Sequence, residues 1–383
     1  MNNISEITRG FYWYWINSIP RVGNVKIHNL LERFKNPKAV FYAKKEDYLK
    51  VDKITKNDAK AIEEAKTASY ILKDYIKLRK SDMNFTYPGK EDYPRRLLEL
   101  NDYPVNLYYY GKLPDFTKPV VSIVGARGCT DYGRRVAFDF ARAFASRGIQ
   151  VISGMALGID YYGHRGALRA GGYSLGVLGT GVDLCYPRNN LELYLELKEK
   201  GGLISEYKPK TPAIAANFPM RNRLISALSD AVIVVEARGQ SGSKITVNHA
   251  LDQGRDVFVI PGRISDPLSV GCLELLKEGA NVMLKVDDIY DCNEIKRKGI
   301  ENVALQGKIS PQNEQFRHNL NKLPIASPKN MVYSELDLYP CALDDLVTKT
   351  RLPLRVVVEN LLELELEGLA EETSKNCYVR VQI

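Results

Sequence analysis

The middle of the chain alternates short apolar runs with longer amphipathic stretches. The runs lack polar–apolar alternation, which is typical of parallel strands covered on both faces. We expect strands at 120–125, 149–153, 174–179, 231–236, 256–260 and 281–285. We expect helices at 131–147, 160–170, 189–200, 217–229, 241–253 and 271–278. This order predicts an α/β fold, an extended Rossmann-like doubly wound sheet whose ligand sites lie at the carboxyl ends of its strands.

The chain before this region has a helical pattern. Residues 1–84 carry an aromatic cluster at 11–15 and an apolar stripe after Gly23, which predicts an N-terminal helical domain. The stretch 19–31 resembles a SAM-like or helix-hairpin-helix element, in which a turn offers backbone N–H groups to a nucleic-acid phosphate. A helical domain that only packs against its neighbours stays an open alternative. Tyrosines and prolines at 87–119 indicate a connecting segment that adds a strand to the next domain.

Two further segments follow the predicted Rossmann-like domain, which we place at 85–290. Residues 291–324 are polar and irregular, which favours a linker. Residues 325–383 show a helix at 343–349, a turn, a longer helix at 356–366 and a terminal strand at 378–383. This pattern predicts a C-terminal winged-helix domain.

Charge is distributed unevenly over the 383 residues, whose formal net charge is +8. Residues 1–118 hold 22 Lys and Arg against 15 Asp and Glu, whereas residues 325–383 hold 6 against 10. A polyanion is therefore expected to bind to the first two thirds of the chain rather than to the last sixty residues. The longer winged-helix helix and the residue after it carry four glutamates, so we expect this helix to contact protein rather than DNA.

The remaining composition excludes several classes of protein. The six cysteines are scattered without a C-x-x-C pair, so we expect no metal site and no disulfide framework. No apolar run has the ~18 residues of a membrane span, and the N-terminus lacks a cleavable leader pattern. The expected location is the cytoplasm, without membrane contact.

Two nucleotide-binding motifs fail on spacing. A G-x-G-x-x-G motif starting at Gly125 would need glycines where Arg127 and Thr130 stand, and no acidic residue closes the second strand, so NAD is disfavoured. The stretch 239–245 is not a P-loop, because glycine and lysine are not adjacent and Ile245 replaces the metal-binding hydroxyl. We expect no cofactor.

Two short patterns with possible catalytic meaning favour structural roles. Ser174 lies in a G-x-S-x-G pattern, but it precedes a strand, whereas a nucleophile elbow follows one. Asp160 and His164 are four residues apart on a helix and could pair or bind a metal. A capping aspartate beside a hydrogen-bonded histidine explains them better. We expect no catalytic residue.

Five strand-end loops converge in the predicted sheet, and four of them have an arginine or lysine nearby. They are 125–128, 153–160, 179–181 with the following 186–189, 218–225 and 241–246. Backbone N–H groups and cations at one edge of a sheet favour an extended groove for a chain of phosphates, with aromatic side chains available to stack bases. The sequence therefore predicts a single-stranded nucleic-acid site.

The same loops carry a resemblance to a known family. The motifs are Gly125-Ala-Arg127, Ser153-Gly-Met-Ala-Leu-Gly-Ile-Asp160, Tyr186-Pro187, Phe218-Pro-Met-Arg-Asn-Arg-Leu-Ile225, Gly242-Ser-Lys-Ile-Thr246 and Gly254-Arg-Asp-Val-Phe-Val-Ile-Pro-Gly262. In order and spacing, the chain from about 85 to 285 resembles the DNA-processing protein A family (DprA, also called Smf). The resemblance implies a non-catalytic protein that binds and protects incoming single-stranded DNA in natural transformation and helps load the RecA recombinase. It also implies a homodimer formed through the Rossmann-like domain.

The candidate DNA-binding residues combine this resemblance with the charges of the loops. They are Gly125, Arg127, Ser153, Gly154, Gly158, Asp160, Arg188, Arg221, Asn222, Arg223, Gly242, Ser243, Lys244 and Thr246. Arg188 and Lys244 are included for charge and position alone. The family pattern has an apolar residue at position 244, and it has Gly-Thr-Asn where this chain has Gly271-Cys-Leu273.

One enzymatic alternative stays open. The glycine-rich architecture also resembles nucleoside-monophosphate phosphoribohydrolases of the "lonely guy" family. Those enzymes carry a Pro-Gly-Gly-x-Gly-Thr loop and a catalytic glutamate, whereas this chain has Gln240-Ser-Gly-Ser243. A nucleotide-processing enzyme is therefore the second hypothesis.

Overall fold

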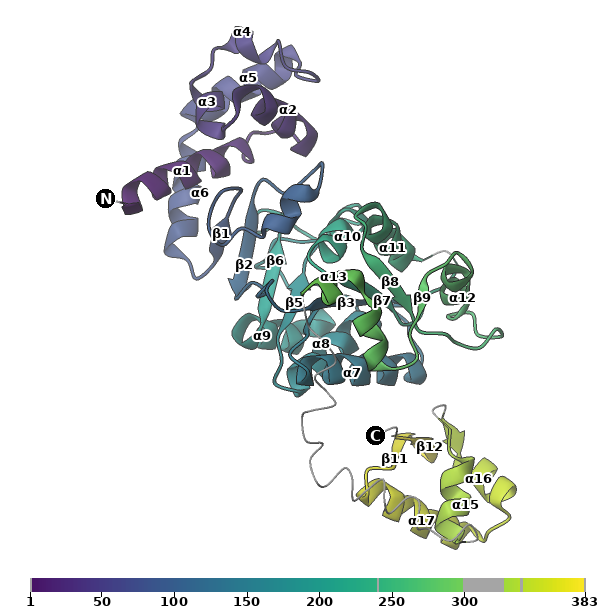
Figure 1. Cartoon of the computed structure of the whole chain (residues 1–383). Coiled ribbons are helices and arrows are strands. Elements are labelled where there is room, and N and C mark those ends of the chain that lie inside the picture. The colour runs from purple at the N-terminus through teal and green to yellow at the C-terminus, as the bar shows by residue number, and fades with distance from the viewer. Residues whose placement is uncertain (1, 240, 299–326, 338–339, 382–383) are drawn as a thin grey trace. The chain divides into compact units, whose positions relative to one another are not determined.

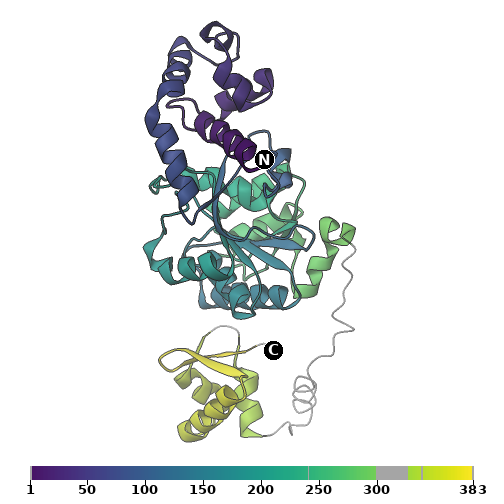
Figure 2. The same ribbon diagram turned by 90° about the vertical axis from the view of Figure 1, so that its left-hand side faces the viewer.

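A computed structural model describes residues 2–239, 241–298, 327–337 and 340–381, with side chains from residue 9 onward. The chain folds into two compact units (Figures 1 and 2). One comprises Met1–Gly128 and Ala137–Gly299, and the other comprises Cys129–Val136 and Ile300–Ile383. None of the described helices is both long and apolar enough to cross a membrane.

The larger unit is built on a nine-stranded sheet of order β1-β2-β6-β5-β4-β3-β7-β8-β9. Its parallel strands are β3 (Val120–Val124), β4 (Gln150–Ser153), β5 (Ser174–Val177), β6 (Gly202–Ser205), β7 (Ala231–Val234), β8 (Asp256–Val259) and β9 (Asn281–Val282). The short strand β1 (Asn84–Thr86) and β2 (Leu107–Gly111) add antiparallel pairs at one edge. The doubly wound sheet is confirmed, and the tyrosine-rich segment supplies β2 as predicted.

Helices cover both faces of the sheet, which explains why its central strands are buried without alternation. The helices are α7 (Asp131–Ser146), α8 (Ile159–Arg169), α9 (Leu191–Lys200), α10 (Asn217–Ala227), α11 (Gly242–Asp252) and α12 (Val270–Lys277). Figure 1 shows α7, α8 and α9 on one face and α10 and α11 on the other. The two groups of helices lie on opposite faces because connections between parallel strands are right-handed. The chain moves from β3 toward β6 in one direction and from β7 toward β9 in the other, so a right-handed connection places its helix on a different face in each half.

The order of the strands reverses between β3 and β7. From β3 the chain adds β4, β5 and β6 on one side, and then β7, β8 and β9 on the other. The loops at the carboxyl ends of β3 and β7 therefore diverge to opposite faces and leave a crevice between them, the usual ligand position in such sheets.

The N-terminal helices share an apolar core with the edge of the sheet. They are α1 (Asn2–Ile16), α2 (Asn24–Phe34), α3 (Pro37–Tyr42), α4 (Lys45–Tyr48), α5 (Lys56–Thr67) and α6 (Ser69–Lys80). Their buried cluster includes Trp15 and Ile62 and continues to Tyr108 of β2. The predicted boundary at residue 84 falls at the start of β1, and this buried cluster extends across it.

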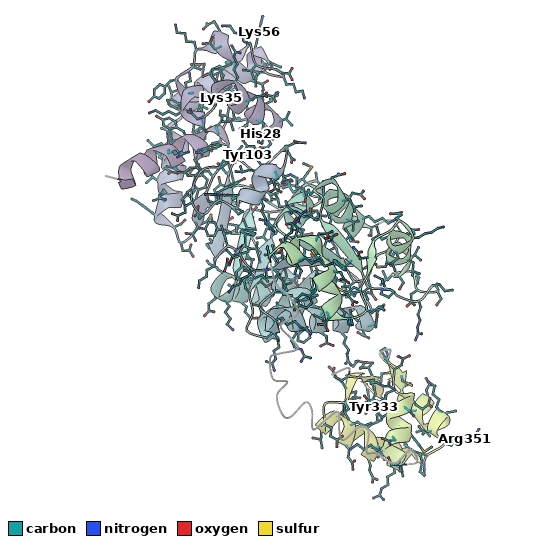
Figure 3. All side chains as sticks on the ribbon, viewed as in Figure 1. His28, Lys35, Lys56, Tyr103, Tyr333 and Arg351 are labelled. Atoms are coloured by element: carbon teal, nitrogen blue, oxygen red, sulfur yellow. The ribbon has the colours of Figure 1, made fainter. Side chains whose placement is uncertain are left out.

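A second contact joins these helices to the connecting segment. The His28 Nε2 atom lies 2.8 Å from the carbonyl oxygen of Tyr103, and the two rings meet edge to face (Figure 3). The Asn24 amide donates a hydrogen bond of 3.0 Å to the carbonyl oxygen of Asp102. The first half of α2 is thus held against the segment that leads into the sheet.

The smaller unit contains a three-stranded sheet of order β10-β12-β11. Its elements are α15 (Pro328–Glu335), β10 (Cys341–Ala342), α16 (Leu343–Thr350), α17 (Leu354–Leu366), β11 (Ala370–Ser374) and β12 (Cys377–Arg380). This is the predicted winged helix, with α15 as an added first helix. The predicted linker begins too early, because η3 (Val286–Asp291) and α13 (Asn293–Arg297) are helical; its remainder, 299–324, lies outside the described residues.

Candidate nucleic-acid interface

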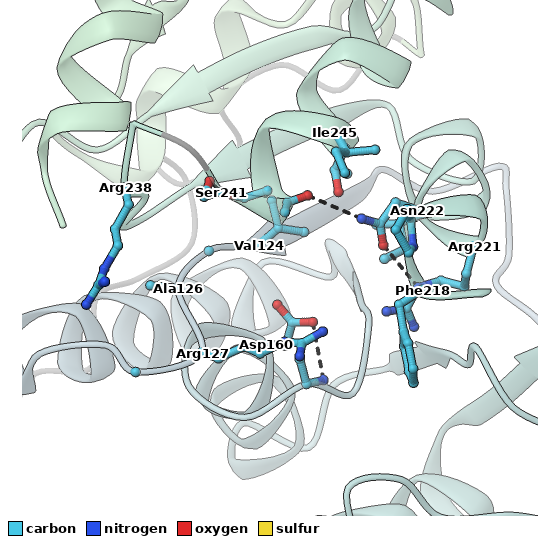
Figure 4. Close-up of a pocket in the computed structure, with 18 of the residues that line it drawn as sticks. Val124, Ala126, Arg127, Asp160, Phe218, Arg221, Asn222, Arg238, Ser241 and Ile245 are labelled. Atoms are coloured by element: carbon cyan, nitrogen blue, oxygen red, sulfur yellow. Dashed lines mark hydrogen bonds between the residues drawn. The ribbon is translucent and has the colours of Figure 1, made fainter. Parts of the chain in front are cut away.

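A pocket of about 360 Å³ opens at the crevice between the carboxyl ends of β3 and β7, and we call it the switch-point pocket (Figure 4). Its walls come from four loops and from the first turns of α10 and α11. The lining residues are Val124, Gly125, Ala126, Arg127, Gly128, Ala156, Asp160, Phe218, Pro219, Arg221, Asn222, Ile225, Arg238, Ser241, Gly242, Ser243, Ile245, Thr246 and Leu268. Eight of the fourteen predicted site residues are among them.

The loop after β3 forms the floor of the pocket and positions Arg127. A Cβ atom on Gly125 would lie 2.7 Å from Ile159 and 2.8 Å from the carbonyl oxygen of Glu236, so only glycine lets the three loops meet there. Arg127 is exposed, and its guanidinium carbon lies 5.8 Å from the centroid of the Phe218 ring. A cation and an aromatic face are thus presented together at the mouth of the pocket.

The loop after β4 is locked in place by its own aspartate. The buried Asp160 carboxylate accepts hydrogen bonds from the N–H groups of Gly154 and Ala156, at 3.1 and 3.3 Å. Gly158 has φ +75°, and a Cβ there would lie 2.3 Å from the carbonyl oxygen of Ala126. Gly154 and Gly158 shape this loop without lining the pocket, and Asp160 shapes it while it also lines the pocket.

Arg221 lies beneath the pocket and connects three elements. Its guanidinium donates to the carbonyl oxygens of Gly154 and Val177, and its Nε donates to the side-chain oxygen of Asn222 at 3.2 Å. Burial lowers the pKa of Arg221 to about 10, and the nearby Asp160 carboxylate opposes that shift. Burial likewise raises the pKa of Asp160, against the field of Arg221. Arg221 therefore stays charged at neutral pH, and its positive charge lies beneath the pocket.

The amino end of α11 forms the opposite wall. Ser241 is its N-cap residue, but the Ser241 side chain makes no capping bond to the helix; its hydroxyl lies 2.6 Å from that of Ser243. The Asn222 amide donates to the carbonyl oxygen of Gly242 at 3.3 Å and holds this end against α10. The N–H groups of a helix's first turn and the positive end of its dipole favour an anion.

Three residues at the pocket were missed by the sequence interpretation. Arg238, exposed after β7, lines the pocket (Figure 4). Phe218 lines it as well, and its ring lies 5.3 Å from that of Tyr186, which is 45% exposed. The signal for Phe218 and Tyr186 was their place in the quoted motifs, whereas Arg238 could have been found as a cation three residues before the loop 241–246.

Besides Gly154 and Gly158, four predicted residues do not line the pocket. Ser153 is fully buried and donates to the carbonyl oxygen of Ile123 in the neighbouring strand. Lys244 pairs with Glu274 at 2.6 Å, and Arg188 is exposed at the start of a short helical turn after β5.

Arg223, the fourth of them, is held within the fold by acidic partners. It is 4% exposed and donates to the carboxylates of Asp102 and Glu206, at 2.8 and 2.7 Å, which raises its pKa. Its charge is thereby neutralised, so the structure gives Arg223 a role in joining α10 to β6 and the connecting segment.

The two patterns with possible catalytic meaning meet in the core. His164 Nδ1 lies 2.8 Å from the Ser174 hydroxyl, and both side chains are fully buried. Burial lowers the pKa of His164 to about 3, so the ring is neutral at physiological pH. A serine that no substrate can reach is not a nucleophile, and His164 is hydrogen-bonded as expected. The capping role expected of Asp160 is wrong, because the N-cap of α8 is Gly158 and the Asp160 carboxylate binds N–H groups of the preceding loop instead.

Comparisons with known proteins agree with this architecture. The family model described as DNA recombination-mediator protein A matches residues 84–294, and that of the DprA winged helix domain matches residues 321–374. Protein Smf of Escherichia coli (strain K12) is 36% identical over 279 residues, which cover 73% of this chain and 72% of that relative. The DNA processing protein DprA of Streptococcus pneumoniae is 40% identical over 197 residues, 51% of this chain and 70% of the relative.

Two solved structures are also similar. The crystal structure of DNA processing protein A from Streptococcus pneumoniae has a TM-score of 0.64 at 30% identity and covers 75% of this chain and 96% of that chain. A structure addressing the single-stranded DNA binding mode of DNA processing protein A from Helicobacter pylori has a TM-score of 0.50 at 30% identity. It covers 55% of this chain and 95% of that chain.

Proposed function

The chain belongs to the DNA recombination-mediator protein A family (DprA/Smf), and from this membership we propose that it binds single-stranded DNA through the switch-point pocket. The relative from Helicobacter pylori is described as binding single-stranded DNA. The observation that carries the proposal for this chain is the junction of three arginines with the amino end of α11.

The charges of the pocket select a phosphate. Arg127, Arg221 and Arg238 contribute three positive charges, and the carboxylate of Asp160 in the pocket lining is turned to backbone N–H groups. The first turn of α11 adds N–H donors on the opposite wall. A phosphodiester bound there meets cations on one side and a helix dipole on the other.

The aromatic pair at the mouth selects a single strand. Tyr186 and Phe218 present ring faces beside Arg127, where an unpaired base can stack. A base inside a duplex has both faces covered by its neighbours and cannot use these rings. We therefore expect the pocket to hold a phosphate while an adjoining base stacks on the aromatic pair.

The enzymatic alternative needs a carboxylate directed at the ligand. Among the described residues that line the pocket, Asp160 is the only acid. Its carboxylate is hydrogen-bonded to backbone N–H groups of the loop after β4 and so is not directed at a ligand. Its burial also leaves it little access to a bound nucleoside. The geometry thus favours binding without catalysis.

The cellular role follows from family membership. We propose that the chain protects incoming single-stranded DNA during natural transformation, helps load RecA and works as a homodimer through its Rossmann-like domain. The family model supports the recombination-mediator part of this role. Its test is RecA filament formation on strands coated with a single-strand-binding protein, with and without this chain.

A titration tests the DNA proposal directly. A labelled single-stranded oligonucleotide and the matching duplex are titrated with the full chain at about 50 and 200 mM salt. We expect preference for the single strand and an affinity that falls with salt, by a slope of about −0.7 for each phosphate neutralised. Equal affinity for both forms, or turnover of a nucleoside monophosphate, would contradict the proposal.

A further inference from the structure

Helix α17 of the smaller unit presents an apolar stripe to solvent. Leu354, Leu362 and Leu366 are 52%, 55% and 89% exposed, and Val358 between them is half-buried. These residues are four apart in sequence, so they follow one face of the helix. A different set, Val357, Leu361 and Leu364, packs into the core of the unit. The helix thus has a second apolar face that folding does not use.

Glutamates border this stripe. Glu359 pairs with Arg355 at 2.8 Å, while Glu363 and Glu367 share Lys329 at 3.4 and 2.6 Å. Two cations therefore face three acids at the stripe. The surrounding segment 325–383 has ten acidic and six basic residues, a net charge of −4.

This surface does not suit DNA. In helix-turn-helix domains the helix at this position enters the major groove and contacts base edges with polar side chains. Here that position carries leucines, and the acids beside them repel phosphates instead of releasing counterions.

A second copy of the same surface is also disfavoured. Pairing two α17 stripes would bring six glutamates together with only two copies each of Arg355 and Lys329. Like charges placed opposite each other oppose association. The complementary surface is apolar and positively charged.

We propose that the α17 stripe binds a basic amphipathic helix of a partner protein. Leucines of the stripe pack against apolar residues of that helix at intervals of three and four, and its lysines or arginines pair with the bordering glutamates. The proposal rests on the smaller unit alone and stands apart from the DNA site.

The test uses the full chain and a labelled synthetic helix of about 15 residues, with leucines every three or four positions and lysines elsewhere. We expect the combined substitution Leu362→Glu and Leu366→Glu to weaken binding about tenfold or more. The substitution adds negative charge, so an attraction that is only electrostatic would become tighter. Loss of affinity therefore identifies the apolar stripe.

Matched controls complete the test. Leu284→Glu, at a leucine 70% exposed in the larger unit, should leave peptide binding unchanged. Leu366→Glu alone, at the most exposed position of the stripe, provides a second variant with minimal effect on folding. Undiminished binding by both stripe variants, or equal binding of a peptide with glutamates in place of lysines, overturns the proposal. Loss of self-association or of duplex binding in the same variants would assign the stripe to a second copy or to DNA.

Discussion

The Arg221 guanidinium donates a hydrogen bond of 2.8 Å to the carbonyl oxygen of Gly154 and so ties α10 to the loop after β4. A second donation reaches Val177 at the end of β5. Since Arg221 is only 4% exposed, its principal contacts are with the protein itself. The arginines of the pocket thus divide into one that holds the loops and two, Arg127 and Arg238, that face solvent.

Replacing Arg221 should destabilise the fold. Arg221→Met removes a charged donor from two buried carbonyl oxygens, those of Gly154 and Val177, and removes the cation nearest the Asp160 carboxylate. We expect a loss of about 3 kcal/mol in the free energy of unfolding, measured by urea denaturation. Arg127→Met, at an exposed site, is the control and should change stability by less than about 0.5 kcal/mol. Equal stability of both variants would show that Arg221 does not hold the loops.

Replacing Arg127 should lower the affinity for DNA without changing the stability of the fold. Arg127→Ala removes an exposed cation at the mouth of the pocket, so we expect single-strand affinity to fall about tenfold, with unchanged thermal unfolding. The dependence of affinity on salt should become shallower by about 0.7. Arg188→Ala removes another exposed arginine, one that does not line the pocket, and should change neither the affinity nor its salt dependence. A matching loss there would mean that general charge, not the pocket, binds the strand.

Much of the fold follows from local pattern. The buried runs such as Val120–Val124 predict strands because a sheet covered on both faces tolerates no polar alternation. Strand β6 was missed because only Leu203 and Ile204 are large and apolar in it. Its position depends on pairing with β5 and, antiparallel, with β2, and such distant partners leave no local signal.

The sequence predicts which loops form the candidate site, but it does not predict the partners of the arginines in those loops. The strand-end pattern indicated four segments that contribute to the pocket, because loop geometry is local, whereas no described residue of the fifth, 179–189, lines it. The orientation of Arg223 is not local, since it depends on Asp102, more than a hundred residues earlier in the chain. Arginines that bind ligand and arginines that bind the protein's own acids look alike in a sequence.

Lys244 provides a test of that distinction. The sequence interpretation makes it a phosphate contact, whereas the structure pairs it with Glu274 outside the pocket lining. We expect Lys244→Leu to leave both DNA affinity and its salt dependence unchanged, and to cost at most about 1 kcal/mol of stability, because exposed ion pairs contribute little. A clear loss of affinity in the same titration would restore the phosphate contact.

Phe218 should matter through its ring. Phe218→Leu keeps an apolar side chain but removes the stacking face, so we expect single-strand affinity to fall about tenfold. Phe218→Tyr keeps the face and should bind nearly as the parent does. Duplex affinity, measured in parallel, should not respond to either change. If both variants lose affinity equally, the ring face is not what binds the strand, and base stacking on Phe218 is excluded.

Burial of His164 should make stability depend on pH. Its pKa is lowered from 6.5 to about 3, chiefly by burial and further by Arg221, so the unfolded chain takes up a proton before the folded one does. Stability is therefore fully present above pH 6.5 and is lost progressively as the pH falls toward 3. His164→Asn, whose amide can reach the Ser174 hydroxyl, removes this dependence. We expect the stability advantage of the parent over the variant in urea denaturation to shrink by about 2 kcal/mol between pH 7.5 and pH 5. The other histidines are common to both proteins and cancel, so parallel pH curves would mean that His164 is protonated without cost in the folded state.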